Sequence, residues 1–311
     1  MSDEVGGVGA ASTATHGPQH APSWITLGTM SGPIPSDVRH QPANVLYDDA
    51  SAIVVDCGDG AVDQLRKAAI PLPAVRTVIL SHLHVDHTAG LYGLIGRRLQ
   101  AHIPGALTIY GPPGTLRVVN AIRSSFDFAS GLMSRVPGLT HQLDAEITVV
   151  EITDGSQFTL GRIDVTAAIN THYRYPEGSP EAKRYQSLSL RFDTPTRSIA
   201  YTGDTGPSEK VEQLARGADM LVSEITDPEQ VTSQLSRTLP IPPAALAAIK
   251  RRFELEHLTA DEVGLLASRA EVKSVVITHN PLTAENMDRA RDTIGCRFTG
   301  PVAFADDLDS Y

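Results

Sequence analysis

Short apolar runs alternate with segments of helical spacing along most of the chain. In the first half these runs are rich in β-branched residues and bounded by turn residues, which predicts strands at 24–27, 45–47, 52–56, 77–80 and 107–110. Helices are expected between these strands, at 61–69, from Leu91 to Ile95, and after the turn Gly111 to Gly114. This β-α-β-α order is typical of an α/β unit.

The second half is richer in strands and then repeats the same order. Apolar or alternating runs predict strands at 147–150, 158–160, 163–167, 187–192 and 198–201. Strands at 220–222 and 274–277 follow, together with helices at 260–267 and 285–294. Two β-rich halves flanked by helices predict an α/β fold in which two sheets pack face to face with helices outside, a four-layer αββα sandwich.

Residues 1–22 differ in composition from the rest of the chain. They are rich in Gly, Ala, Ser, Thr, His and Pro and contain almost no bulky apolar side chains. Such a segment cannot bury enough surface to order itself, so we expect a flexible N-terminal arm. Residues 23–311 are long enough to bury a large core and are expected to form a single domain.

The charge and cysteine content narrow the classes of function. The 311 residues include 36 acidic and 26 basic side chains, a formal net charge of -10. Phosphate neutralisation needs clusters of Lys and Arg, so this balance argues against broad binding of nucleic acid or anionic membrane. The two cysteines, Cys57 and Cys296, form neither a disulfide framework nor a Cys-x-x-Cys pair. With neither a membrane span nor a signal peptide in the pattern, we expect a cytoplasmic enzyme.

Four side chains that commonly bind metals come directly after the predicted strand 77–80. They are His82, His84, Asp86 and His87. In extended backbone the first three project to one side, and chemistry in open α/β sheets takes place outside the carboxyl ends of the strands. Histidines and a carboxylate at this spacing are typical of a metal site.

Three later residues follow predicted strands in the same way. His172 comes after the run that ends at Asn170, Asp204 follows 198–201, and His279 follows 275–278. One histidine after a strand is usually only a loop residue. Because all three share this position with the first cluster, we expect them to complete the metal site.

The order of these residues resembles the metal-ligand motifs of the metallo-β-lactamase-fold hydrolases. The matching pattern is His82-x-His84-x-Asp86-His87, then His172, Asp204 and His279. Asp56 matches the first motif of that superfamily, in which an aspartate supports the metal loop. The resemblance extends from Trp24 to about Phe304 and implies a metal-dependent hydrolase with the four-layer fold.

Within the superfamily the chain is most similar to the ribonuclease Z and arylsulfatase branch. Residues 26–29 resemble the opening strand and loop of that branch, and 223–226 resemble its Glu-Ala-Thr segment. Residues 256–259 resemble its His-Ser-Thr segment, which carries an additional catalytic histidine, here His257. The stretch between the last two segments is longer than in the compact pattern, so we expect an insertion around 227–255. It forms either a pocket wall or lid for a small substrate or a surface excursion.

The resemblance also implies two metal ions in each subunit. One would be held by His82, His84 and His172 and the other by Asp86, His87 and His279, with Asp204 bridging them. Imidazole and carboxylate ligands without thiolate suit Zn²⁺, while ligand type leaves Mn²⁺ and Fe²⁺ open. An acidic residue in place of His84 would indicate the di-iron oxygen-reducing relatives, so the histidine favours hydrolysis.

Two such cations can share a water, lower its pKa and present hydroxide as the nucleophile. Asp86 and Asp204 would orient this hydroxide, and His257 would donate a hydrogen bond or proton to the developing oxyanion or leaving group. Asp56 and Glu224 would support the ligating imidazoles. A helix-capping or buried structural role remains open for His257, and a turn or capping role remains open for the two acids.

The expected substrate is a small molecule. The tRNA-processing members of the branch carry a protruding arm rich in glycine and proline, and 123–143 is not basic enough to replace it. Together with the acidic net charge, this favours an ester, lactone, sulfate or phosphate ester, or hydrolytic dehalogenation of an activated aromatic, and argues against nucleic acid as a partner. The alternatives are a ribonuclease Z-like tRNA 3′-end endonuclease and a non-catalytic metal-binding protein. The resemblance implies a homodimer.

Overall fold

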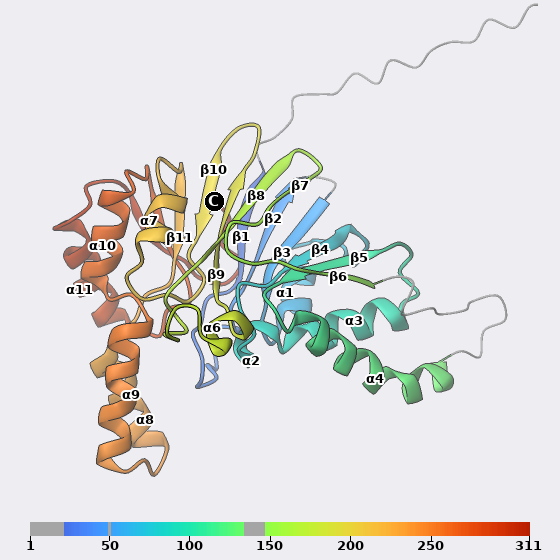
Figure 1. Cartoon of the computed structure of the whole chain (residues 1–311), viewed down its shortest axis with the longest axis horizontal. Helices are drawn as coiled ribbons and strands as arrows, with labels where there is room; N and C mark the ends of the chain where they lie inside the picture. The colour runs from blue at the N-terminus through green and yellow to red at the C-terminus, as the bar shows by residue number, and fades with distance from the viewer. Residues whose placement is uncertain (1–21, 49–50, 134–146) are drawn as a thin grey trace, which may run out of the picture.

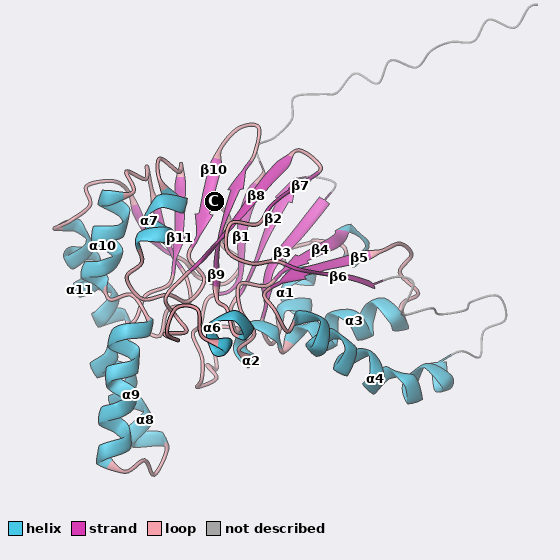
Figure 2. Ribbon diagram, viewed as in Figure 1, coloured by secondary structure: helices cyan, strands magenta, loops and turns pink. Residues whose placement is uncertain are grey.

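Two β-sheets lie face to face at the centre of the protein, with helices on their outer faces (Figure 1, Figure 2). A computed structural model describes residues 22–48, 51–133 and 147–311. The N-terminal arm expected at 1–22 therefore lies outside the described residues except for Pro22.

Among the described residues, the first sheet contains six strands in sequence order. They are β1 (Ser23–Gly28), β2 (Ala43–Asp48), β3 (Ser51–Cys57), β4 (Val75–Ile79), β5 (Leu107–Gly111) and β6 (Ile147–Glu151). β1 to β3 pair antiparallel, whereas β3 to β6 pair parallel.

In the part of the chain that the structure describes, the second sheet contains seven strands in the order β13-β12-β11-β10-β9-β8-β7. They are β7 (Gln157–Leu160), β8 (Ile163–Ile169), β9 (Leu188–Asp193), β10 (Ser198–Tyr201), β11 (Met220–Ser223), β12 (Val275–Ile277) and β13 (Val302–Phe304). β10 to β13 pair parallel, so the carboxyl ends of β10, β11 and β12 lie at one edge.

Helices cover the outer face of each sheet. Those on the first sheet are α1 (Ala61–Lys67), α3 (Gly90–Gln100) and α4 (Thr115–Met133), and those on the second are α7 (Glu209–Ala215), α10 (Ala260–Arg269) and α11 (Ala284–Gly295). Shorter helices are the 3₁₀ turn Leu72–Ala74, α2 (Val85–Thr88) and α6 (Pro180–Arg184).

The period-two alternation of strand side chains divides the core into three layers. In β3, Val54 packs under α1 and α3, whereas Val55 packs between the two sheets. In β12, Ile277 packs under α10 and α11, whereas Val276 faces the first sheet. Each strand of this kind is therefore buried on both faces, and the predicted four-layer αββα sandwich is confirmed.

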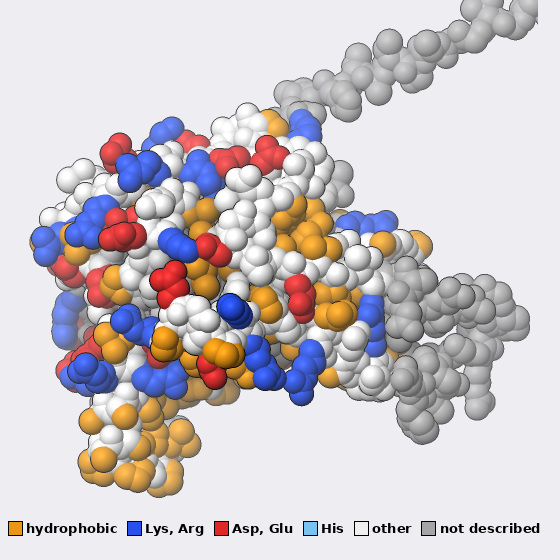
Figure 3. Space-filling view, in the orientation of Figure 1, with side chains coloured by type: hydrophobic (Ala, Val, Ile, Leu, Met, Phe, Trp, Pro, Cys, Tyr) orange, Lys and Arg blue, Asp and Glu red, His pale blue; other side chains and the backbone are white. Residues whose placement is uncertain are grey.

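Two further helices of the described residues, α8 (Pro228–Thr238) and α9 (Pro243–Glu256), form a hairpin that projects from the body (Figure 1). Apolar side chains gather at its free end (Figure 3), where Leu239 is 47% exposed. The hairpin occupies the segment expected at 227–255, and its status as an insertion stays a prediction. Within the ranges that the structure describes, no helix is long and apolar enough to cross a membrane.

Candidate metal centre

The structure brings the seven predicted metal-site side chains together at the carboxyl edge of the sheets. His82 and His84 follow β4, Asp86 and His87 lie in α2, His172 follows β8, Asp204 follows β10, and His279 follows β12. The cluster is assembled from both halves of the chain because the strands of each half end at this edge. All but His84 and Asp86 are buried.

Asp56 at the end of β3 fixes the loop that carries the first histidines. Its Oδ1 accepts the backbone N–H of Ser81 at 2.7 Å, and its Oδ2 lies 2.8 Å from both Ser81 Oγ and Tyr201 Oη and 2.9 Å from His87 Nδ1. A carboxylate accepts hydrogen bonds, so His87 carries its proton on Nδ1 and turns Nε2 toward the centre. Asp56 thus makes the expected contact with an imidazole of the cluster.

Replacing Asp56 with alanine should lower the free energy of unfolding by about 3–5 kcal/mol, because it leaves several buried donors unpaired. Urea denaturation measures this loss. Asp63→Ala, at an exposed aspartate in the first turn of α1, is the matched control and should change stability by less than about 0.5 kcal/mol. Equal losses in the two variants would contradict the proposed anchoring.

His82, His84 and His172 form a first triad. His84 Nδ1 lies 3.1 Å from the Nε2 atoms of both His82 and His172. Burial lowers the pKa of all three imidazoles, that of His172 to about 3. The rings are therefore neutral at neutral pH, which is the form that binds a metal ion.

Asp86, His87 and His279 form a second triad. Asp86 Oδ2 lies 3.6 Å from His87 Nε2 and 3.7 Å from His279 Nε2. Burial by itself would raise the pKa of Asp86, but His87 and His279 outweigh it and hold that pKa below its ordinary value. The backbone N–H of Gly32 also donates to this carboxylate, at 3.2 Å.

Asp204 lies between the two triads. Its Oδ1 is 3.3 Å from His87 Nε2, and its Oδ2 is 3.3 Å from His279 Nε2 and 3.8 Å from His82 Nε2. Burial would raise the pKa of this carboxyl, but the surrounding histidines, His279 first, hold it well below its ordinary value. An ionised carboxylate therefore spans both triads.

The chemistry and spacing of these donor atoms fit divalent cations. His87 Nε2, His279 Nε2 and Asp204 Oδ1 are buried and have no hydrogen-bond partner among the described residues. Orphaned polar atoms are costly in a protein interior, and three that face one another need a shared partner. Ligands held at about 2.0–2.2 Å in a tetrahedron lie about 3.3–3.6 Å apart, close to the separations described above.

His257, at the C-terminal end of α9, lies beside both triads. Its Nδ1 is 2.6 Å from Glu224 Oε2, and Phe253 stacks on its ring at 5.1 Å between centroids. Burial would lower the pKa of His257, but Glu224 outweighs it and raises that pKa to about 9. Phe253 was not identified from sequence, although its position one helical turn before His257 is a usable signal.

A cavity of about 690 Å³ opens at the centre. The side chains that line it from the centre are His84, Asp86, His172, Asp204, His257 and His279. Other parts of its wall include Pro33 and Pro35 in the loop after β1, Asp59 in the turn after β3, and Ile249, Arg252, Phe253 and Glu256 of α9. The hairpin is therefore a wall of the site, which was one of the two roles expected for 227–255.

The chain is similar to known proteins along most of its length. Residues 51–280 match the family described as the beta-lactamase superfamily domain. The chain belongs to this superfamily. It is 27% identical to ribonuclease Z of Mycobacterium bovis over 293 residues, which cover 91% of this chain and 96% of that protein.

Solved structures of superfamily members share the fold. The metallo-beta-lactamase fold protein YhfI from Bacillus subtilis superposes with a TM-score of 0.68 at 19% identity, covering 93% of this chain and 98% of that one. The short form of human tRNase Z superposes with a TM-score of 0.63 at 20% identity, again covering 93% and 98%. The predicted membership near the ribonuclease Z branch is confirmed, and the chain is a metal-dependent hydrolase.

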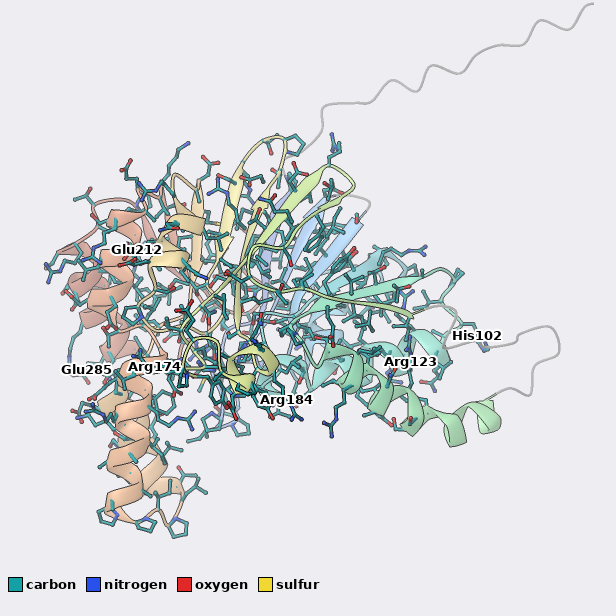
Figure 4. The ribbon with its side chains drawn as sticks, in the orientation of Figure 1. His102, Arg123, Arg174, Arg184, Glu212 and Glu285 are labelled. Carbon is teal, nitrogen blue, oxygen red and sulfur yellow. The ribbon has the colours of Figure 1, made fainter. Side chains whose placement is uncertain are left out.

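The expectation of a small-molecule substrate, and with it the argument against nucleic acid, is wrong. The finding that overturns it is the match to ribonuclease Z along nearly the whole length of both chains. Net charge is a sum over the whole protein, whereas RNA needs cations only where it binds. Arg252 lines the cavity, and Arg174 and Arg184 lie near α9 and α6 (Figure 4). Of the segment 123–143, residues 134–143 lie outside the described residues.

Proposed function

We propose that the protein is a zinc-dependent endoribonuclease that cleaves precursor tRNA at its 3′ end. The observation that carries this proposal is the pair of triads joined by Asp204, in a chain that matches ribonuclease Z over 91% of its length. Two adjacent cation sites suit phosphodiester hydrolysis, in which the attacking and leaving oxygens both develop charge.

The two triads would each hold one zinc ion. His82, His84 and His172 would ligate the first, Asp86, His87 and His279 the second, and Asp204 would contact both. Nitrogen and carboxylate donors without thiolate support the choice of zinc. When bound, the ions would supply a water of lowered pKa and polarise a phosphoryl oxygen.

The residues of the chain do the rest of the chemistry. Asp86 and Asp204, both ionised, would accept hydrogen bonds from the attacking water and so orient it. Glu224 favours the protonated form of His257. His257 would then give its proton to the oxygen that departs as the P–O bond breaks. The apolar cavity wall formed by Ile249 and Phe253 would exclude bulk water beside the scissile bond.

Zinc-loaded protein should cut a precursor tRNA once at its 3′ trailer and leave mature tRNA intact, as read on a denaturing gel. Removal of metal with EDTA should abolish cleavage, and added Zn²⁺ should restore it, because every proposed step needs the polarised water. Hydrolysis of bis(p-nitrophenyl) phosphate by the same preparation is the control for an active centre. Turnover of that diester with no cut in the precursor would contradict the proposed substrate.

A further inference from the structure

Three tyrosines form a row that leads from the metal centre to solvent. They are Tyr173, Tyr175 and Tyr185, in the segment 171–187 between β8 and β9, and the catalytic steps above do not use them. We propose that this row, the tyrosine strip, binds single-stranded RNA next to the scissile phosphate. The proposal rests on the endoribonuclease function and names where its substrate lies.

The strip begins at the centre itself. The ring of Tyr173 lies 5.2 Å from that of His84 and 5.1 Å from that of His172. The ring of Tyr175 follows at 6.5 Å, and that of Tyr185 lies a further 5.7 Å on. A strand of RNA stacked on these rings could therefore run directly on from a scissile phosphate bound at the first triad.

The outer rings are presented to solvent by ordered backbone. Tyr175 and Tyr185 are each 43% exposed, although large aromatic side chains are usually buried. Tyr185 directly follows the short helix α6, whose first turn is capped by Ser179 Oγ accepting from Ala182 N–H at 3.1 Å. Arg174 ties the segment to α9 by donating to the carbonyl of Leu255 at 3.3 Å.

Basic side chains lie in the same segment as the tyrosine rings. The segment carries Arg174, Lys183 and Arg184 against Glu177 and Glu181, so it is locally positive in a chain of net charge -10. The guanidinium carbon of Arg184 lies 5.2 Å from the ring centre of Tyr185, and both Arg174 and Arg184 are exposed near α6 and α9 (Figure 4).

Aromatic rings interleaved with arginine are the arrangement that holds unpaired nucleic acid. Bases of any sequence stack on exposed rings, and the cations pair with the phosphates between them. An endonuclease must also bind the strand that extends from its centre. The tyrosine strip provides a binding path for that strand from His84 and His172 to the surface. Stacking and charge together therefore select single-stranded RNA as the occupant.

The test measures the binding of a fluorescein-labelled twelve-nucleotide RNA without self-complementarity to the full-length protein, by fluorescence anisotropy. The double variant Tyr175→Ala/Tyr185→Ala should raise Kd at least about tenfold, since each stacked base contributes to affinity. Tyr175→Phe/Tyr185→Phe keeps both rings and should stay within about twofold of wild type. If the double alanine variant does not fold, the two single alanine variants test the proposal instead. Each should show a smaller increase in Kd than the increase of about tenfold expected for the double variant.

A charge variant tests the phosphate contact separately. Arg184→Gln should reduce the slope of log Kd against log salt by about 0.7, the value for one phosphate contact to a single strand. Arg289→Gln, at an exposed arginine of α11 paired with Glu285, should leave that slope unchanged. An unchanged Kd in the double alanine variant, or no binding of the RNA by the wild-type protein, would overturn the proposal that the tyrosine strip binds RNA. Wild-type cleavage of precursor tRNA decides the proposed function independently of these affinities.

Discussion

Asp204→Ala should abolish hydrolysis, with kcat lower by about 10⁴-fold or more, and should lower the zinc content of the purified protein. The reason is geometric. Asp204 Oδ1 and Oδ2 each lie 3.3 Å from an Nε2 of the second triad, and Oδ2 also approaches the first triad at 3.8 Å. Without this carboxylate, neither proposed ion keeps its full ligand set and the attacking water loses an acceptor.

The measurement combines elemental analysis of zinc with initial rates on precursor tRNA and on bis(p-nitrophenyl) phosphate. Asp154→Ala is the matched control, because Asp154 is a partly exposed carboxylate paired with Lys210 and lies outside the centre. That variant should retain zinc and both activities. Wild-type zinc content and turnover in Asp204→Ala would show that the carboxylate does not join the two triads.

The metal centre is largely predictable from sequence because its ligands occupy short motifs at strand ends. His82 to His87 are contiguous, and each later ligand follows an apolar run that predicts a strand. The topology rule that carboxyl ends meet at one edge then brings the separate motifs together. The fold follows from the same periodicities, since strands buried on both faces need a layer on each side.

Long-range contacts and some local departures from regular backbone are not predictable in this way. The bond between Tyr201 Oη and Asp56 joins residues 145 positions apart, and nothing local marks it. The helix predicted at 61–69 ends at Lys67 because Ala69 adopts a positive φ of 58°. The sequence pattern also does not predict the helix α6, since Pro176 and Gly178, shortly before it, indicate an irregular loop.

The error about substrate has a related origin. A net charge of -10 describes the whole chain, whereas the placement of its cations is a property of the fold. Arg174, Arg184 and Arg252 are separated by up to 78 positions in sequence, yet all three lie around α6 and α9. Composition can therefore exclude a broadly basic surface but not a local one.

His257→Ala should slow cleavage of precursor tRNA by about 10²–10⁴-fold while the zinc content stays at the wild-type level. The Nδ1 atom of His257 lies 2.6 Å from Glu224 Oε2, so the pair can hold a proton beside the centre. The alkoxide that leaves when RNA is cleaved needs such a proton. p-Nitrophenolate is a stable leaving group without a proton. Hydrolysis of bis(p-nitrophenyl) phosphate should therefore fall much less.

The ratio of the two losses separates the proton-donor role from the structural alternative for His257. Glu224→Gln is the matched variant, because it removes the charge that favours the protonated imidazole and keeps the size of the side chain. It should show the same selective loss on RNA, smaller than that of His257→Ala. Equal losses on both substrates, or loss of zinc together with a lower melting temperature, would instead show that His257 supports the fold of the site. A residue that only supports the fold of the site holds both phosphodiesters in the same centre, so its loss should slow both reactions, whereas a proton donor matters mainly for the alkoxide leaving group.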